Sequence, residues 1–170
     1  MTRRHATLPT ELGDLLVVAD GEALAGITFP GHWHPLPADA LGVEVEASRD
    51  PVITRFGVEL AEYLAGTRTE FDLPMAPAGD EFQHAVWQML RDIPYGTTVT
   101  YGELALQLGD RNLARRVGNA VGRNPLSIIV PCHRVVGADG SLTGYAGGLE
   151  RKRFLLELEG APVVAQARLF

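Results

Sequence analysis

A proline-bearing segment near the middle of the chain, residues 67–79, most constrains the fold, because it separates two stretches with different patterns. Pro74 and Pro77 have no amide hydrogen to give to a helix or a sheet, so we expect this segment to be a linker. Strand patterns come before it and mainly helical patterns after it. The chain has 170 residues, a length typical of roughly one to two domains. We therefore expect an N-terminal domain at residues 1–79, linker included, and a C-terminal domain at residues 80–170.

The first half predicts a small α/β domain. Apolar residues at 15–19 and 24–29 flank Asp20-Gly21, a dipeptide that favours a tight type I′ turn between two strands. Residues 43–45 have the composition of a further short strand. Apolar positions recur at helical spacing over residues 52–64, and Gly66 ends that helix.

The second half predicts a mostly helical domain. Helical spacing and N-cap residues predict helices from Asp80 to before Pro94, from Thr100 to Leu108, at 112–121 and at 149–159. The second and third of these are short and joined by a glycine-containing turn, with arginines on the later one. This pattern indicates a helix-turn-helix, although helical hairpins without a DNA function share it. Residues 127–130 have the pattern of a buried strand, and residues 137–148 that of a glycine-rich loop.

The charge is unevenly distributed along the chain. A formal net charge of −6 argues, taken alone, against a nucleic-acid partner. However, residues 1–80 hold 13 acidic and 5 basic residues, whereas residues 81–170 hold 8 acidic and 10 basic residues. Residues 111–138 hold five arginines and no acidic residue. The charge count leaves two interpretations open for this stretch, a solvated helix face or a surface for a polyanion.

Several classes of protein and site are excluded by composition. The single cysteine, Cys132, excludes an internal disulfide and a multi-cysteine zinc site. No apolar run reaches the roughly 18–20 residues of a membrane span, and no apolar region follows the basic N-terminal residues as it would in a secretory signal. We therefore expect a cytoplasmic protein that does not contact a membrane. His32-Trp33-His34 offers two metal ligands, but a plain exposed loop is the favoured interpretation.

Cys132 lies between the predicted buried strand and a loop, in Pro131-Cys132-His133-Arg134. Catalytic groups are often presented at such strand ends, and the neighbouring imidazole and guanidinium would lower the pKa of the thiol. A lone buried cysteine that only fills space is an equally supported alternative. Adjacent residues of an extended chain point to opposite faces, so His133 would reach the sulfur only across a turn or through a water.

The residues from Ile129 to Val136 resemble the active-site signature of the O6-alkylguanine-DNA alkyltransferases, also called methylated-DNA–protein-cysteine methyltransferases. The resemblance continues in the same order over about half of the chain, through Phe82-x-x-x-Val86-Trp87, Ile93-Pro94-Tyr95-Gly96, Thr100-Tyr101-Gly102-Glu103-Leu104-Ala105, Ala114-Arg115-x-Val117-Gly118, Asn124-Pro125, Gly144-Tyr145-x-Gly147-Gly148 and Leu155-Leu156-x-x-Glu159-Gly160. The first 80 residues match only loosely. The resemblance implies an α+β architecture, with a small ribonuclease-H-like α/β domain followed by a mostly helical domain that contains a winged-helix-like helix-turn-helix.

The resemblance also implies DNA repair by direct reversal. In this family a cysteine takes the alkyl group from O6 of a guanine that is flipped out of duplex DNA, and O4-alkylthymine is an open second substrate. Each molecule reacts once and keeps the alkyl group, so the implied enzyme is a cofactor-free, single-turnover methyltransferase. Cys132 matches the nucleophile, activated through a water by His133 and Glu159, and Tyr101 matches a tyrosine that serves guanine N3 and helps to rotate the nucleotide. Without the resemblance, Glu159 is an ordinary helix-end acid and Tyr101 a core aromatic.

Other residues match the family's pocket for the flipped base. These are Val135, Tyr145, Ala146, Gly147, Asn124 and Lys152. Ala146 stands where the family often has a serine, so a hydroxyl contact is lost and a backbone N–H contact is expected instead. Asn124 is implied to link the DNA-reading helix to the cysteine segment, with a helix C-cap as the alternative. For Lys152 the alternative is a solvated helix lysine.

The implied DNA-reading helix departs from the family pattern. Arg115 matches the arginine that fills the stack after the nucleotide leaves, and Ala114 and Gly118 match small residues that allow approach to the minor groove. Arg116 and Asn119 are bulkier than the family's residues, and Arg116 is expected to contact a phosphate.

The first half contains histidines but no cysteine, so the structural zinc of some members is not expected. The implied partner is alkylated double-stranded DNA bound by a monomer, with cooperative loading left open.

Three other functions fit parts of the pattern. An alkyltransferase-like binding protein recognises the lesion without repair, but such proteins replace the cysteine that is present here. A helix-turn-helix regulator would use Cys132 only structurally, so a Cys132→Ser variant would behave like the wild type. A cysteine hydrolase using His133 and Glu159 would turn over repeatedly.

Overall fold

The computed structural model describes residues 3–163, which fall into two compact units. The first unit contains residues up to Ala78 together with the short segment Pro125–Ile129. The second unit contains Gly79–Asn124 and the chain from Val130 onward. The first unit is therefore discontinuous, because a segment from the second half of the chain belongs to it.

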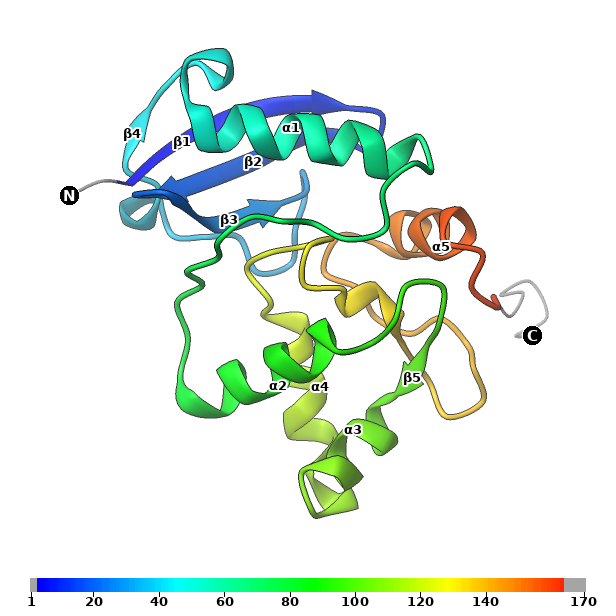
Figure 1. Cartoon of the computed structure of the whole chain (residues 1–170). Helices are drawn as coiled ribbons and strands as arrows, with labels where there is room; N and C mark the ends of the chain where they lie inside the picture. Colours follow the sequence, from blue (N-terminus) through cyan, green and yellow to red (C-terminus); the bar gives the residue numbers. More distant parts are fainter. Residues whose placement is uncertain (1–2, 164–170) are drawn as a thin grey trace. The chain divides into compact units, whose positions relative to one another are not determined.

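A mixed four-stranded sheet forms the centre of the first unit (Figure 1). Its strands have the order β3-β2-β1-β4, and they are β1 (Arg3–Thr10), β2 (Gly13–Asp20), β3 (Ala23–Thr28) and β4 (Val43–Glu44). The predicted hairpin is confirmed as β2 and β3, and Gly21 in its turn has a φ of 61°, a conformation that glycine adopts without steric cost. Strand β1 was not predicted. Its N-terminal end carries Arg3 and Arg4, which form ion pairs with Asp20 and Asp50. These partners are distant in sequence, so no local pattern predicts the ion pairs.

Helix α1 (Pro51–Leu64) lies across one face of this sheet (Figure 1), and its predicted extent is confirmed. Asp50 begins the helix by accepting hydrogen bonds from the amides of Val52 and Ile53, both at 3.0 Å. Proline at the first helical position needs no amide partner. The buried apolar side chains of the helix recur at intervals of three and four residues, at Ile53, Phe56, Leu60 and Tyr63. Two short 3₁₀ helices, η1 (Ala38–Ala40) and η2 (Ala47–Arg49), lie in the connection before it.

The outer edge of β3 is covered by two isolated bridges. Met75, in the predicted linker, bridges Leu24, and Leu126 bridges Ile27, both in parallel. The amide of Ile27 donates to the Pro125 carbonyl at 2.8 Å, and the amide of Ser127 donates back to the Ile27 carbonyl at 3.2 Å. These bonds satisfy backbone groups that an uncovered edge strand would expose. The segment at 125–127 is therefore anchored by its backbone to this sheet.

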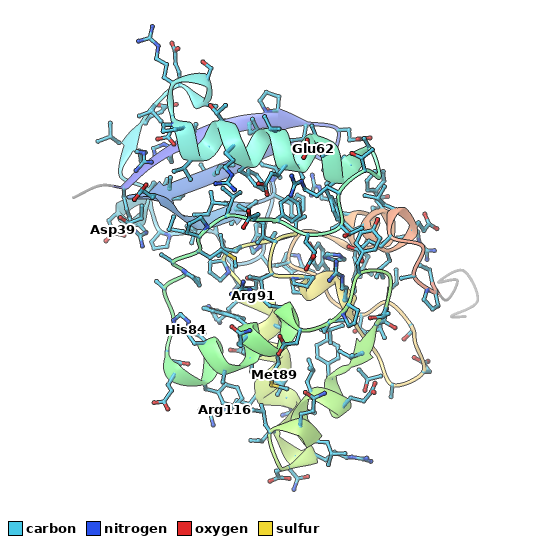
Figure 2. The ribbon with its side chains drawn as sticks, in the orientation of Figure 1. Asp39, Glu62, His84, Met89, Arg91 and Arg116 are labelled. Carbon is cyan, nitrogen blue, oxygen red and sulfur yellow. The ribbon has the colours of Figure 1, made fainter. Side chains whose placement is uncertain are left out.

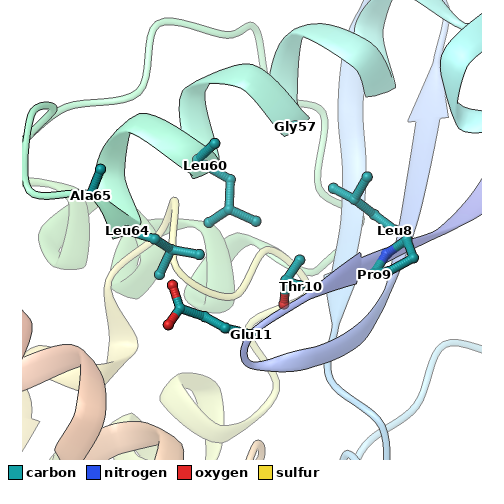
Figure 3. Close-up of a pocket in the computed structure, with 9 residues that line it drawn as sticks. Leu8, Pro9, Thr10, Glu11, Gly57, Leu60, Leu64 and Ala65 are labelled. Carbon is teal, nitrogen blue, oxygen red and sulfur yellow. The ribbon is translucent and has the colours of Figure 1, made fainter.

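The first unit also contains an open, largely apolar groove of about 310 Å³ (Figure 3). It lies between the end of β1 with the following turn, which contribute Leu8 and Glu11, and the later turns of α1, which contribute Leu60 and Leu64. None of the residues lining it belongs to the predicted active site.

Short helices and one small parallel pair of strands make up the second unit. In chain order they are α2 (Glu81–Arg91), β5 (Val99–Thr100), α3 (Tyr101–Gln107), η3 (Arg111–Leu113), α4 (Ala114–Gly122), η4 (Cys132–Arg134), β6 (Val135–Val136) and α5 (Leu149–Leu158). Capping boxes at Asp80 and Thr100 confirm the predicted starts of α2 and α3. Within the described residues 3–163, no helix is long and apolar enough to cross a membrane.

Strand pairing positions the site in this unit. Val99 and Thr100 pair in parallel with Val135 and Val136. Helix α3 begins directly after β5, and the η4 turn with Cys132 ends directly before β6. The pairing therefore brings the first residue of α3, Tyr101, and the cysteine turn to neighbouring positions.

Candidate active site

The cysteine turn is built from two tight turns, and the predicted strand at 127–130 is wrong. The amide of Ile129 donates to the Ser127 carbonyl at 2.9 Å, and the amide of Cys132 donates to the Val130 carbonyl at 2.8 Å. Both bonds span only two residues, which defines γ-turns. Ile128 has a φ of 75°, a strained conformation for a β-branched residue, whereas Pro131 has φ −81° and ψ 65°, the relaxed form of this turn. The segment is buried and apolar, as predicted, but it folds as a double turn that leads into η4.

The thiol of Cys132 is almost completely buried, with 7% of the residue exposed. Burial raises the pKa of this thiol above its ordinary value, while a hydrogen bond from Asn124, the Lys152 ammonium and a hydrogen bond from Tyr145 act in the opposite direction. The expectation that the adjacent guanidinium lowers the thiol pKa is not supported, since Lys152 supplies the nearby cation. The resting side chain is therefore a thiol, and a group that accepts its proton is required for nucleophilic attack.

His133 and Glu159 form a buried pair next to the cysteine. Nε2 of His133 lies 2.8 Å from Oε2 of Glu159, and neither side chain is exposed. Nδ1, the other ring nitrogen, is buried without a hydrogen-bond partner among the described residues. Burial lowers the pKa of His133 below its ordinary value; the Glu159 carboxylate opposes this effect, and the charges of Arg134 and Lys152 add to it. The imidazole is thus held neutral with Nδ1 available.

Arg134 is a site residue that the sequence reasoning did not select. Its Nε and Nη2 donate to Oε1 and Oε2 of Glu159 at 2.8 and 2.9 Å, and its Nη1 donates to the Ile93 carbonyl at 2.7 Å. The guanidinium carbon also lies 5.7 Å from the centre of the Tyr95 ring. The signal that could have found it was the position directly after His133, because residues in one 3₁₀ turn can reach the same carboxylate.

Lys152 is buried, so its alternative interpretation as a solvated helix lysine is wrong. Its Nζ donates to the Thr143 carbonyl at 2.7 Å, in the glycine-rich loop that precedes α5. Burial lowers the pKa of Lys152 from 10.5 to about 8, with the Cys132 charge acting in the opposite direction. Tyr101 reaches the same loop through a hydrogen bond with the Thr143 side chain, although burial is the main reason that its pKa is raised. Thr143 therefore joins the loop to both α3 and α5.

The remaining predicted pocket residues lie around this turn. The side-chain amide of Asn124 donates to the Val130 carbonyl at 2.8 Å and spans the base of the double turn. Val135 is buried in β6, and Tyr145, Ala146 and Gly147 are buried in the loop before α5.

Helix α4 separates its arginines from its buried face. Val117 and Ala120 are buried, whereas Arg115, Arg116 and Asn119 are exposed. The predicted helix at 112–121 is confirmed with a short 3₁₀ turn, η3, ahead of it.

Small and aromatic residues flank the exposed face of α4. On one side, the Tyr101 ring lies close to Gly118: a Cβ added there would meet it at 3.7 Å, an ordinary van der Waals contact. On the other side, the guanidinium carbon of Arg116 lies 3.9 Å from the centre of the Phe82 ring of α2. Arg116 is labelled in Figure 2. The Arg116 side chain is therefore directed toward α2, and Arg115 is exposed beside it on the helix.

The His32-Trp33-His34 loop does not gather metal ligands. His32 is buried, and its Nδ1 accepts the His34 amide at 3.1 Å, while Trp33 is 60% exposed. No group of three or more His, Cys, Asp or Glu side chains suited to a metal ion occurs within residues 3–163.

Known protein families match both halves of the chain. Residues 81–161 match the DNA-binding domain of 6-O-methylguanine DNA methyltransferase, and residues 4–77 match its ribonuclease-like domain. These matches confirm the predicted fold class, a ribonuclease-like domain followed by a helical DNA-binding domain.

Individual relatives align over nearly their whole length. A methylated-DNA–protein-cysteine methyltransferase from Methanosarcina acetivorans is 44% identical over 162 residues, which cover 92% of this chain and 98% of the relative. One from Mycobacterium bovis is 41% identical and covers 98% of both chains. The crystal structure of Mycobacterium tuberculosis OGT in complex with DNA is 41% identical, with a TM-score of 0.81, and covers 94% of this chain and 95% of that one. Both domain matches and these full-length alignments establish that the chain belongs to the methylated-DNA–protein-cysteine methyltransferase family.

Proposed function

We propose that this protein repairs DNA by transferring the alkyl group of O6-alkylguanine in duplex DNA to the thiol of Cys132, once per molecule. The observation that carries the proposal is the buried His133–Glu159 pair beside that thiol, with Nδ1 of the imidazole available. Family membership supports alkyl transfer to cysteine as the chemistry. We place this chemistry in the cytoplasm, where a lone thiol stays reduced.

The proton route follows from the resting state of the thiol. Because burial keeps Cys132 protonated, its proton must leave as the sulfur attacks. Nδ1 of His133 is the acceptor, through one water in the family's relay, and Glu159 orients the ring by accepting from Nε2. The S–C bond forms as the bond between the alkyl carbon and O6 breaks, and the thiol proton, taken up by His133, finally resides on the guanine, which stays in the DNA strand. The products are a thioether on Cys132 and an unmodified guanine.

Other residues are assigned to holding the base. We assign Tyr101 to guanine N3 and to the rotation of the nucleotide, because it begins α3 beside the cysteine turn and is only partly buried. Asn124 fixes the turn through Val130 and contributes a donor to the sulfur. The loop with Tyr145, Ala146 and Gly147, together with the main chain of Val135, forms the wall of the base pocket. Lys152 holds this loop through Thr143.

DNA binding is assigned to the exposed face of α4. Arg115 is the side chain that enters the stack when the nucleotide flips out, a step that costs a few kcal/mol. Ala114 and Gly118 keep the helix narrow for the minor groove. Arg116, stacked on Phe82, keeps its outward N–H groups for a backbone phosphate. Binding as a monomer, with or without cooperativity, belongs to this proposal, as does action on O4-alkylthymine.

The test uses a duplex that carries one O6-methylguanine, followed by intact-protein and peptide mass measurement. We expect a gain of one methyl group on the Cys132 peptide that saturates at one equivalent, and no gain in a Cys132→Ser variant. A methyl group on another residue, or no gain at all, overturns the proposal. Conversion of more than one equivalent of O6-methylguanine to guanine in the duplex per protein favours the hydrolase alternative.

A further inference from the structure

The guanidinium of Arg134 donates two hydrogen bonds to the carboxylate of Glu159, the residue that orients the proposed base His133. We propose that Arg134 is a positioning residue: by holding Glu159 as a carboxylate, it keeps His133 neutral and Nδ1 free to accept the thiol proton. The inference rests on the proposed function, and it adds a role for a residue that contacts neither the thiol nor the alkyl group.

The geometry is that of a two-pronged ion pair. Oε1 of Glu159 accepts from Nε of Arg134 at 2.8 Å and from the Gly96 amide at 3.3 Å. Oε2 accepts from Nη2 of Arg134 at 2.9 Å and faces Nε2 of His133 at 2.8 Å. The Glu159 side chain is 0% exposed and that of Arg134 only 9% exposed, so water screens this pair weakly.

The rest of the guanidinium is fixed as well. Nη1 donates to the Ile93 carbonyl at 2.7 Å, and the Tyr95 ring lies against the guanidinium carbon. A Cβ on Gly96 would lie 3.0 Å from the main-chain oxygen of Glu159, so this loop approaches the end of α5 closely. Arg134 therefore cannot leave Glu159 without breaking contacts to the loop after α2.

This arrangement decides where the imidazole proton lies. A carboxylate that is ionised against Arg134 only accepts hydrogen bonds, so the hydrogen of the 2.8 Å contact belongs to Nε2. A neutral imidazole carries one hydrogen, and Nδ1 is then a lone pair. The charged and titratable groups facing His133 are Glu159 at the end of α5, Arg134 and the Cys132 thiol on η4, and Lys152 on α5. A protonated ring would join two cations to one buried carboxylate, which the site disfavours.

Without Arg134, the protonated form of His133 would be favoured over the neutral form. His133 would then be the ring that can supply a positive charge to Glu159, and an imidazolium–carboxylate pair would replace the guanidinium–carboxylate pair. Nδ1 would carry a hydrogen and could not accept the thiol proton. Nearby charges of this kind shift a pKa by roughly 1–3 units.

The test compares Arg134→Met, which removes the charge, with Arg134→Lys, which keeps the charge but not the two-pronged geometry. The rate of alkyl transfer from free O6-benzylguanine is measured from pH 5 to pH 9. We expect the acid limb of the Arg134→Met profile to lie about one pH unit or more above that of the wild type. The Arg134→Lys profile should keep the wild-type limb with a lower plateau. Equal acid limbs in all three proteins would overturn the inference, because a purely structural residue lowers the plateau without moving the limb.

Two further measurements cover folding and independence from the transfer reaction. Arg134→Met combined with Glu159→Gln removes both charges of the ion pair together, and its acid limb should return to or below the wild-type position. Titration of the imidazole nitrogen signals of His133 by NMR reports its protonation without any alkyl transfer. If the wild type fails to react with O6-methylguanine DNA, the proposed function fails, whereas the NMR titration still tests Arg134. An unchanged His133 titration in Arg134→Met refutes the inference even if transfer occurs.

Discussion

Replacing Lys152 with methionine should change the pH dependence of stability in a defined way. The side chain is fully buried, and burial lowers its pKa from 10.5 to about 8. Each pKa unit corresponds to about 1.4 kcal/mol, so the charged form costs the folded state about 3 kcal/mol. The unfolded chain binds the proton more tightly between pH 8 and pH 10.5, so wild-type stability rises with pH across that window. Below pH 8 the whole cost is present, and above pH 10.5 it is absent.

Methionine fills similar space and carries no charge, so a Lys152→Met variant lacks this cost at every pH. It also loses the Nζ bond to the Thr143 carbonyl, a loss that is nearly independent of pH. The informative quantity is therefore the difference in unfolding free energy, variant minus wild type, which should fall by about 3 kcal/mol from pH 7 to pH 10.5. Urea unfolding at both pH values measures it, and repeating both proteins in a Cys132→Ser background removes the thiol titration. A difference that stays constant with pH would show that Lys152 has an ordinary pKa, and the argument from burial would be refuted.

Further predictions concern DNA binding and helix caps. Arg116→Ala should weaken duplex binding and reduce the slope of log affinity against log salt by about 1, with a far smaller effect on reaction with free O6-benzylguanine; equal losses on both substrates would place Arg116 in the base pocket. Phe82→Leu removes the stacking partner of that guanidinium and should give a smaller loss of duplex binding in the same salt titration. Asp80→Ala should lower the unfolding free energy by about 1 kcal/mol, since it removes one exposed N-cap. Asp50→Ala should cost about 3 kcal/mol in the same urea experiment, because it also leaves the partly buried Arg4 without its carboxylate; equal costs for the two caps would contradict this reasoning.

Local signals predicted the helices well. Asp80 and Thr100 begin helices because each side chain accepts an amide a few residues later, and such contacts can be recognised from spacing alone. The contact between His133 and Glu159 was expected only through the resemblance, since nothing in composition joins the two residues, and their catalytic role stays a prediction.

Features that depend on distant contacts were missed. Strand β1 is stabilised by pairing with β2 and by ion pairs from its arginines, and its own pattern is not that of a half-buried strand. The apolar run at 127–130 was predicted as a strand because a buried strand and a buried turn have the same composition; the γ-turns arise from bonds between residues two apart. Arg134 binds the carboxylate of Glu159, 25 positions later in the sequence. Its place near Cys132 in the sequence had suggested instead that its charge acts on the thiol.

Residues 125–129 belong to the first unit, although the segments directly before and after them belong to the second. Asn124 precedes this segment and Val130 follows it, and the backbone between them is hydrogen-bonded to Ile27. Residues 80–170 expressed alone would keep every proposed catalytic side chain. They would lose β3, the strand to which residues 125–127 are hydrogen-bonded. The hydrogen bonds that hold residues 125–127 would then be absent, and Ile128 would be free to leave its strained positive φ. The conformation of residues 125–129 thus depends on a strand from the first part of the chain, so removing that part alters the backbone directly before Val130.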